Sequence, residues 1–206
     1  FGAKADNRTD DTAAVQACVD AAKAHGHGAL AYLPGGSYRI TRTLQMTGRG
    51  YGLCGTGFRS MLSWAGDKEG TMLRVHHPQD LLLEHFVLQG APETVRIHHT
   101  ADAGASSVSY DGVYVNGLEQ CRTGLWCDRL PAGAVVLMGH VIGNVRLTDC
   151  GPATILCAQH FYSLTLEGAT QPKTGIAGFL FHNDACHNYA LDVLDNQDVI
   201  VADFYS

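Results

Sequence analysis

Residues 1–40 read FGAKADNRTDDTAAVQACVDAAKAHGHGALAYLPGGSYRI and contain a change of periodicity that indicates the architecture of the chain. Asp10 or Asp11 can cap the N-terminus of a helix over roughly 11–25, and Gly26 can adopt the positive φ that ends it. Apolar residues recur at helical spacing within that range and form one narrow stripe: Val15, Cys18, Val19 and Ala22. The sequence therefore predicts one amphipathic α-helix near the N-terminus.

After the helix the period of the pattern becomes two, which is typical of β-strands. Apolar residues alternate on both sides of the turn at 34–36: Leu30, Tyr32, Tyr38 and Ile40. Similar short strand patterns recur to the end of the chain, at 80–90, 111–117, 144–151, 163–169 and 198–204. The starts at 144 and 163 are 19 residues apart, a plausible length for one coil of a β-solenoid. The other gaps, of about 31 to 35 residues, allow two short coils or one coil with an insertion.

Stacked coils explain this pattern better than a sandwich of hairpins or a doubly wound α/β fold. Two-residue hairpin turns are rare between the segments, and long helices do not alternate with the strands. Coils bury their inward side chains on one another, and a helix before the first coil can cover the open end of the stack. The predicted fold is all-β, a right-handed parallel β-helix with an N-terminal capping α-helix. We expect one domain over 1–206, with the cap segment and helix at 1–27 and coils from 28 that continue beyond Ser206.

Composition excludes several classes of partner. The formal net charge is −6, lysine is scarce and the arginines are scattered, so no basic stripe for nucleic acid is visible. No apolar run approaches the roughly 18 to 20 residues that span a bilayer. The seven cysteines form no CxxC pair, and no spacing matches a metal signature. The acidic balance favours a neutral glycan over a polyuronate, unless a local arginine cluster or a bridging Ca²⁺ overrides the global field.

The opening segment resembles that of the pectate-lyase superfamily. The residues that carry the resemblance are Phe1-Gly2-Ala3, Asp10-Asp11-Thr12, the glycine-rich turn at 26–28 and the Tyr-Leu-Pro-Gly-Gly-Ser-Tyr segment at 32–38. The match is dense over the opening segment, roughly 1–40, and becomes a matter of pattern afterwards. It implies a right-handed parallel β-helix whose members act on carbohydrates and are secreted or exposed at the cell surface.

For function, the resemblance implies a carbohydrate-active enzyme that degrades a polysaccharide or oligosaccharide. We favour a glycoside hydrolase over a polysaccharide lyase, and we expect no cofactor, with Ca²⁺ as the exception for a lyase. The alternative is a non-catalytic β-helix that binds glycans or serves as a scaffold, such as a surface adhesin or a tailspike-like protein. A trimer would favour the tailspike-like alternative.

Candidate catalytic residues lie at or near the predicted strand ends. Asp111, Asp149 and Asp184 could be lined up by stacking, and two carboxylates about 5 to 9.5 Å apart are sufficient for glycoside hydrolysis. His182 and His187 flank Asp184 in the segment HNDACHN and could act with it as an acid/base group. The competing interpretation is that these residues are polar corners that accept backbone hydrogen bonds.

Candidate substrate-binding residues are Trp126 and Tyr114, as platforms for sugar rings, and Arg146. A lyase would also need a base, for which the later coils offer these side chains: Arg122, Arg129, Arg146 and Lys173. The same spacing separates Arg74 from Arg96 and His76 from His98, which suggests that these pairs stack in adjacent coils. Asp10 and Asp11 are assigned to the helix N-terminus and not to the site.

Overall fold

The computed structural model of the chain describes residues 1–99, 107–111, 113–116, 123–131, 135–138, 144–150, 155–157, 163–167, 175–180, 191–194 and 200–205. Within these ranges the chain is mostly β-structure, with one α-helix, α1 (Thr12–His25), and a short 3-10 helix, η1 (Gly57–Arg59). No helix in the described ranges is long and apolar enough to cross a membrane. The strands are β1 (Asp6–Asp10), β2 (Ala29–Tyr32), β3 (Gly36–Ile40), β4 (Leu44–Cys54), β5 (Ser60–Trp64), β6 (Thr71–Glu84), β7 (Val87–Gln89), β8 (Glu93–His98), β9 (Ser107–Asp111), β10 (Tyr114–Asn116), β11 (Thr123–Asp128), β12 (Val135–Met138), β13 (Asn144–Thr148), β14 (Ile155–Cys157), β15 (Ser163–Glu167), β16 (Gly175–Leu180), β17 (Leu191–Leu194) and β18 (Ile200–Tyr205).

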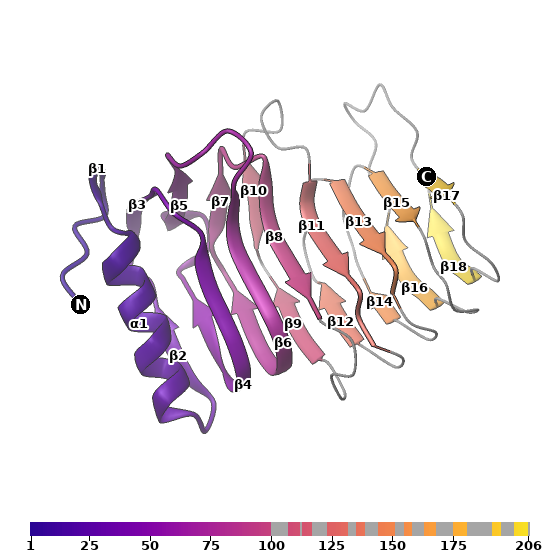
Figure 1. The fold of residues 1–206 in the computed structure, drawn as a ribbon, viewed down its shortest axis with the longest axis horizontal. Coiled ribbons are helices and arrows are strands. Elements are labelled where there is room, and N and C mark those ends of the chain that lie inside the picture. Colours follow the sequence, from indigo (N-terminus) through magenta and orange to yellow (C-terminus); the bar gives the residue numbers. More distant parts are fainter. Residues whose placement is uncertain are drawn as a thin grey trace.

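The strands stack side by side along the long axis of the molecule (Figure 1). Every strand pairing in the described part of the chain is parallel, as expected for coils and not for hairpins. Asn144 of β13 pairs with Ser163 of β15, which confirms that one coil separates these two segments, as their spacing predicted.

The strands form a five-stranded sheet, in the order β1-β3-β5-β7-β10, and a larger sheet that forks at β6. The first half of β6 pairs with β8, and its second half pairs with β9. We call the first half of β6 with β8, β11, β13, β15 and β17 the first branch, and the second half with β9, β12, β14, β16 and β18 the second branch. Because consecutive strands β7, β8, β9 and β10 visit the small sheet, the first branch, the second branch and the small sheet again, the chain winds in stacked coils.

Inward side chains of the first branch form two apolar ladders that hold the coils together. Their members are at most 3% exposed: Leu73, Val95, Leu125 and Val145 in one ladder, and Val75, Ile97, Cys127 and Leu147 in the other. Each such side chain contributes roughly 1.5–3 kcal/mol through burial. The ladders fix the register between coils, and with it the neighbours of every outward side chain.

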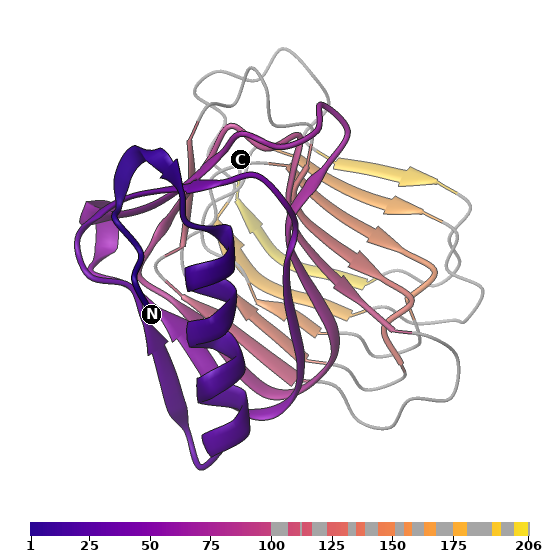
Figure 2. The same ribbon diagram turned by 60° about the vertical axis from the view of Figure 1, so that its left-hand side comes forward.

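Helix α1 lies across the N-terminal end of the stack, where it contacts β2, β3 and β4 (Figures 1 and 2). Val15, Val19 and Ala22 of the predicted stripe are buried, and Cys18 is half-buried. Gly26 has a φ of 63°, as predicted for the residue that ends the helix. The buried face of α1 therefore belongs to the same hydrophobic core as the strands beside it.

Of the two predicted capping residues, Asp10 binds the helix terminus: its carboxylate accepts a hydrogen bond from the backbone N–H of Thr12, the first residue of α1, at 3.0 Å. Asp11 occupies the N-cap position, but its carboxylate accepts hydrogen bonds from the backbone N–H groups of Lys4 and Ala5. One local prediction needs correction. In β2 the alternation holds with the opposite set buried: Ala31 is inside, whereas Leu30 and Tyr32 are about half exposed. The outward Leu30 lies against β4, so an apolar residue here did not indicate the core.

Candidate functional site

Two rows of polar side chains run across the outer face of the first branch, perpendicular to its strands. The arginine row consists of Arg74, Arg96, Trp126 and Arg146, which occupy paired positions on β6, β8, β11 and β13. The histidine row, two positions further along each strand, consists of His76, His98, Asp128 and Thr148. The structure confirms the predicted stacking of Arg74 on Arg96 and of His76 on His98.

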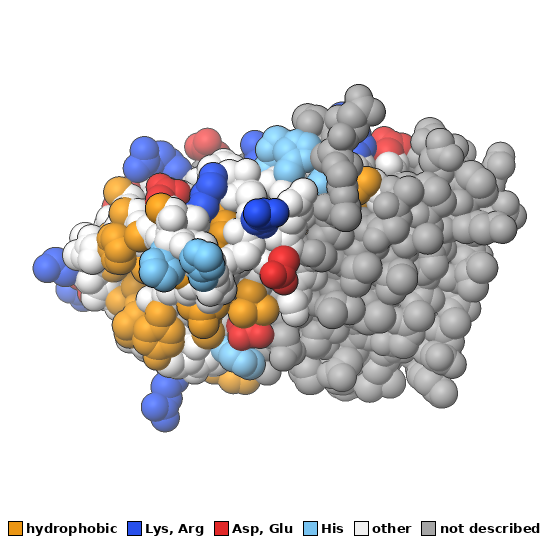
Figure 3. Space-filling view, turned by 90° about the horizontal axis from the view of Figure 1, so that it is seen from below, with side chains coloured by type: hydrophobic (Ala, Val, Ile, Leu, Met, Phe, Trp, Pro, Cys, Tyr) orange, Lys and Arg blue, Asp and Glu red, His pale blue; other side chains and the backbone are white. Residues whose placement is uncertain are grey.

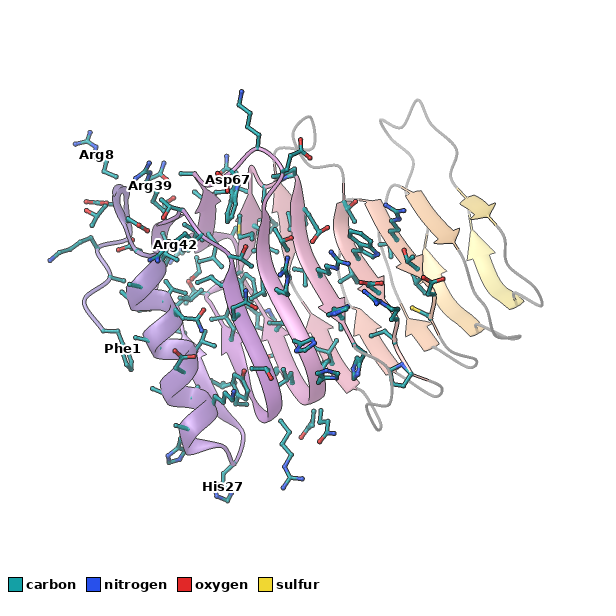
Figure 4. The ribbon with its side chains drawn as sticks, in the orientation of Figure 1. Phe1, Arg8, His27, Arg39, Arg42 and Asp67 are labelled. Atoms are coloured by element: carbon teal, nitrogen blue, oxygen red, sulfur yellow. The ribbon has the colours of Figure 1, made fainter. Side chains whose placement is uncertain are left out.

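The arginine row forms one wall of a groove of about 390 Å³. Sticks project from β6, β8, β11 and β13 along this face (Figure 4). Acidic and hydroxyl side chains continue the lining toward the beginning of the strands. The groove is lined by Glu69, Thr71, Arg74, Pro92, Glu93, Arg96, Thr123, Trp126 and Arg146. Its position follows from the ladders beneath it, because each inward residue of a strand turns the next one outward.

The indole of Trp126 is held between two guanidinium groups. The Cζ atoms of Arg96 and Arg146 lie 3.9 and 4.8 Å from the ring centroid, and these residues come from the strands on either side of β11. Its Nε1–H donates to Thr148 Oγ1 at 2.9 Å. A sugar ring could stack on the indole face only by displacing an arginine. The arrangement therefore orients Trp126 as a spacer between cations, which differs from the open platform expected from the sequence.

The groove concentrates positive charge at its arginine end. The Nε atoms of Arg74 and Arg96 are buried and have no hydrogen-bond partner, and within the described residues Arg74 forms no ion pair. Glu93 is turned toward Thr71, whose hydroxyl donates to Glu93 Oε1 at 2.5 Å. Guanidinium groups match planar carboxylates well, so the arginine end of the groove is suited to an anion.

Asp128 links the two rows. Its side chain is almost fully buried, and one oxygen, Oδ2, accepts from Arg96 Nη2 at 2.5 Å and from His98 Nδ1 at 3.0 Å. The guanidinium of Arg129 lies 3.4 Å from Oδ1. Burial raises the pKa of Asp128, but the hydrogen bond and charge of Arg96 outweigh it, so the net effect is a lowered pKa. Asp128 is therefore a carboxylate at neutral pH.

Four histidines meet at the corner where the first branch ends. The rings of His76 and His98 stack with centroids 5.1 Å apart, and His77 Nδ1 lies 3.0 Å from His99 Nδ1. A group of histidine side chains is also visible on the face seen from below (Figure 3). Burial lowers the pKa of His76 and His98, and burial with the charges of its neighbours lowers that of His99 to about 4. These three imidazoles are neutral at pH 7.

No metal site is formed by the part of the chain that the structure describes, since no three histidine, cysteine or acidic side chains there are placed to ligate one ion. The free cysteines Cys127 and Cys150 are buried, and burial raises the pKa of both thiols. They act as small core residues rather than ligands.

The structure separates two of the predicted catalytic aspartates. Asp149 follows β13 and is exposed, with a φ of 50°, whereas Asp111 ends β9 opposite Glu84. They lie at the corners that precede and follow the second branch, so stacking does not bring them together. Tyr114 lies on β10 in the small sheet, and not in the first branch that holds Trp126 and Arg146. The remaining predictions, His182, Asp184 and His187, fall outside the described residues.

Arg146 and Trp126 were predicted from the sequence and lie together in the structure, whereas Asp128 and Glu93 were not predicted. Asp128 was overlooked because the strand pattern Thr-Gly-Leu-Trp-Cys-Asp places it at a strand end, where a carboxylate is an ordinary corner residue. A usable signal was present, because a position two residues after Trp126 must share its face of the strand.

A family profile described as rhamnogalacturonase A/epimerase, pectate lyase-like, matches residues 1–123. This chain belongs to that family. The profile match confirms the superfamily that the motifs of the opening segment indicated. The profile match also carries the resemblance well past the opening segment, as far as the first residue of β11.

Curated relatives match a short segment only. Alginate lyase 7 and mannuronan C5-epimerase AlgE3, both of Azotobacter vinelandii, are 56% identical to the chain over 41 residues. That segment is 20% of this chain and 5% and 2% of the two relatives, so the chain spans a small part of their length.

Among solved structures, a Geobacillus virus E2 protein, ORF18, aligns with 99% of this chain and 60% of its own at 14% identity and a TM-score of 0.40. The A-module of mannuronan C5-epimerase AlgE4 from Azotobacter vinelandii aligns with 100% of this chain and 96% of its own at 14% identity and a TM-score of 0.36.

Proposed function

We propose that this chain is part of an enzyme that binds and modifies an acidic polysaccharide, a polymer of uronic acids. The observation that carries the proposal is the arginine row, which places three guanidinium groups along one groove parallel to the axis of the stack. A uronate polymer lying along that axis would present successive carboxylates to successive coils, about 4.8 Å apart. The curated relatives are named for acting on alginate and mannuronan, which are polymers of this class.

The local field of the groove supports this substrate against the net charge of −6. Charges more than a Debye length from the groove, about 8–10 Å, are screened by salt, whereas guanidinium groups that touch the ligand are not. The global acidity that favoured a neutral glycan is therefore the weaker of the two effects. The sequence favoured a neutral glycan unless a local arginine cluster overrode the global charge, and the arginine row is such a cluster.

The reaction class that we favour starts with removal of the proton on the ring carbon next to the carboxylate. Neutralising the carboxylate with guanidinium groups makes that proton more acidic, which both polysaccharide lyases and epimerases require. The groove offers this neutralisation through Arg74, Arg96 and Arg146.

A glycoside hydrolase is the second candidate, and it is the enzyme class that the sequence favoured. Glu69 and Glu93 line the same groove, and a pair of carboxylates flanking a glycosidic bond is the usual requirement for hydrolysis. Release of reducing ends without unsaturated products, abolished by Glu93→Gln, would favour this candidate.

We propose further that the coils have the right-handed sense of the family, that α1 acts as a cap, and that the protein acts outside the cell. The parallel pairings and the position of α1 at the end of the stack support the first two proposals. The third is proposed because polymers of uronic acids are found mainly outside the cell. Ca²⁺ bridging a substrate carboxylate to the protein stays a proposal for a lyase.

The proposal is tested with a panel of polyuronates and neutral glycans of equal length. We expect the chain to bind polyuronate oligomers and not neutral ones, with an affinity that falls as salt rises. The double variant Arg74→Gln/Arg146→Gln should weaken binding about 10-fold or more, because two charge-assisted hydrogen-bonding groups are lost. The matched control is Arg8→Gln, since Arg8 is exposed at the N-terminal end of the molecule (Figure 4).

Equal binding of neutral and acidic oligomers would contradict the proposal. Binding of polyuronate without any product, by absorbance of unsaturated uronates, by reducing ends or by epimer content, would favour the non-catalytic alternative of a glycan-binding β-helix.

A further inference from the structure

We infer that His98 is the group that takes the proton from the uronic acid ring bound in the groove, and that Asp128 is its positioning residue. This inference rests on the proposed function and assigns a role to the histidine row, which the arginine groove alone leaves unexplained.

The geometry places the base next to the carboxylate-binding group. Arg96 Nη2 and His98 Nδ1 both contact the same oxygen of Asp128, at 2.5 and 3.0 Å, so the two side chains meet at a single atom. In a uronic acid the carbon that loses its proton is bonded directly to the carboxylate carbon. A carboxylate held by Arg96 therefore has this C–H bond close to His98.

The hydrogen bonds determine which nitrogen is basic. Asp128 is a carboxylate and can only accept, so His98 donates its Nδ1–H to it. In a neutral imidazole this leaves the lone pair on Nε2. The carboxylate fixes the ring orientation and stabilises the imidazolium that forms on proton transfer, as expected for a base that is oriented by a third group. Asp128 is thus placed to act through His98 and not on the substrate.

Burial, together with the neighbouring arginines, keeps His98 neutral before the reaction. Burial lowers its pKa, Arg129 and Arg96 lower it further, and Asp128 opposes them; the stacked ring of His76 is the neighbour from β6. His98 is about one-sixth exposed, which gives it access to the outer face.

The proposed step balances as follows. The ring C–H bond breaks, an N–H bond forms at Nε2, and the electron pair passes into the carboxylate, where Arg96 offsets the added charge. From this carbanion-like intermediate the electron pair has two fates. It expels the glycosidic oxygen on the neighbouring carbon, which takes up a proton from water, or the ring carbon takes up a proton from water on the face opposite to His98; in both cases the imidazolium then returns its proton to solvent. The first outcome gives an unsaturated uronate, and the second gives the epimer.

The experiment compares the full chain with His98→Gln and Asp128→Asn on polyuronate oligomers in D₂O. Products are analysed by absorbance for unsaturation and by mass spectrometry for deuterium on the ring carbon, and binding is measured in parallel. We expect His98→Gln to lower turnover about 100-fold or more, with the affinity for the oligomers changed by less than about 3-fold. The matched control is His27→Gln, an exposed histidine just beyond the C-terminal end of α1 (Figure 4).

Asp128→Asn separates positioning from a merely structural role. Losing the carboxylate lowers the pKa of His98, so the acid limb of kcat against pH should move to lower pH while kcat falls. KM should change little, and thermal unfolding should remain cooperative. A fall in activity with an unmoved acid limb would overturn the positioning role.

Two results would overturn the role of His98. The first is a His98→Gln variant that keeps more than about a third of wild-type turnover. The second is a wild-type chain that binds polyuronate but gives neither unsaturation nor deuterium incorporation; binding then still supports the substrate class. A wild-type chain that binds no polyuronate would remove the proposed function itself, and the inference with it.

Discussion

Two parts of the outer surface have the same backbone arrangement and opposite character: the first branch, and the strands β2 and β4 with the second half of β6. On the first branch, paired positions hold Arg74, Arg96 and Trp126, which project into a groove. Where the second branch continues from β6 into β4 and β2, the outward positions hold Leu82, Gly52 and Leu30. A Cβ atom built on Gly52 would lie 2.7 Å from the Cβ of Leu82 and 2.9 Å from the Cδ2 of Leu30.

The difference shows that in a stack of coils the inward residues provide stability, whereas the outward residues are free to take part in binding and chemistry. The inner ladders define the register, so neither outer face is needed for it. One face is closed by apolar packing over a glycine, and the other is free to collect charged side chains.

Leu125→Ala should lower the free energy of unfolding by about 2–5 kcal/mol, because Leu125 is fully buried in the ladder between Val95 and Val145. Chemical denaturation monitored by circular dichroism measures this. Leu30→Ala is the control, since Leu30 is 48% exposed and its truncation should cost about 1 kcal/mol or less. Equal losses would show that the outer apolar face is as important as the ladder.

Acid should destabilise the histidine corner of the first branch by roughly 1–3 kcal/mol. The pKa of His99 is lowered to about 4 in the folded chain from an ordinary value of 6.5. The unfolded chain therefore binds more protons between these values, and stability falls as pH decreases from about 6.5 to about 4. Denaturation at a series of pH values should show this slope, and His99→Gln should reduce it. An unchanged slope in that variant would exclude His99 as the source.

Gly52→Ala should destabilise the packing of β2, β4 and the second half of β6 by about 1–3 kcal/mol, because the added methyl group meets the backbone and side chain of Leu82. Polyuronate binding should be unchanged at concentrations where the variant is folded. The matched control is Gly50→Ala, where no atom lies within 4 Å of the added Cβ, although its φ of 67° adds some strain. A Gly52→Ala variant as stable as wild type would show that Leu82 and Leu30 can move to accommodate the added methyl group.

Arg74→Gln should change stability by less than about 0.5 kcal/mol, since Arg74 forms no ion pair among the described residues. Its effect on polyuronate affinity should be about 3- to 10-fold. Thermal unfolding and titration of the same sample provide both values. Loss of stability without loss of affinity would reverse the contrast between the two faces.

Part of the site could be predicted from the sequence. The spacing shared by the arginine pair and the histidine pair identified Arg74 and Arg96 as neighbours, because their coil contains no long insertion. The coil from Arg96 to Trp126 is longer, and nothing in the sequence marks how much of it is insertion, so this pairing could not be predicted. Asp111 and Asp149 were grouped by their positions at strand ends, but a strand end does not reveal to which face of the coil the strand belongs.

The amino-acid sequence alone was sufficient to predict the helix, the strand periodicity, the stacked-coil architecture and the family, because these depend on local spacing and on motifs in the opening segment. The placement of Arg96, Trp126 and Arg146 in one groove, and the link that Asp128 makes between Arg96 and His98, emerged only from the folded structure. Neighbours across coils are set by register. Register depends on the length of every corner, and corner lengths vary without leaving a periodic signal.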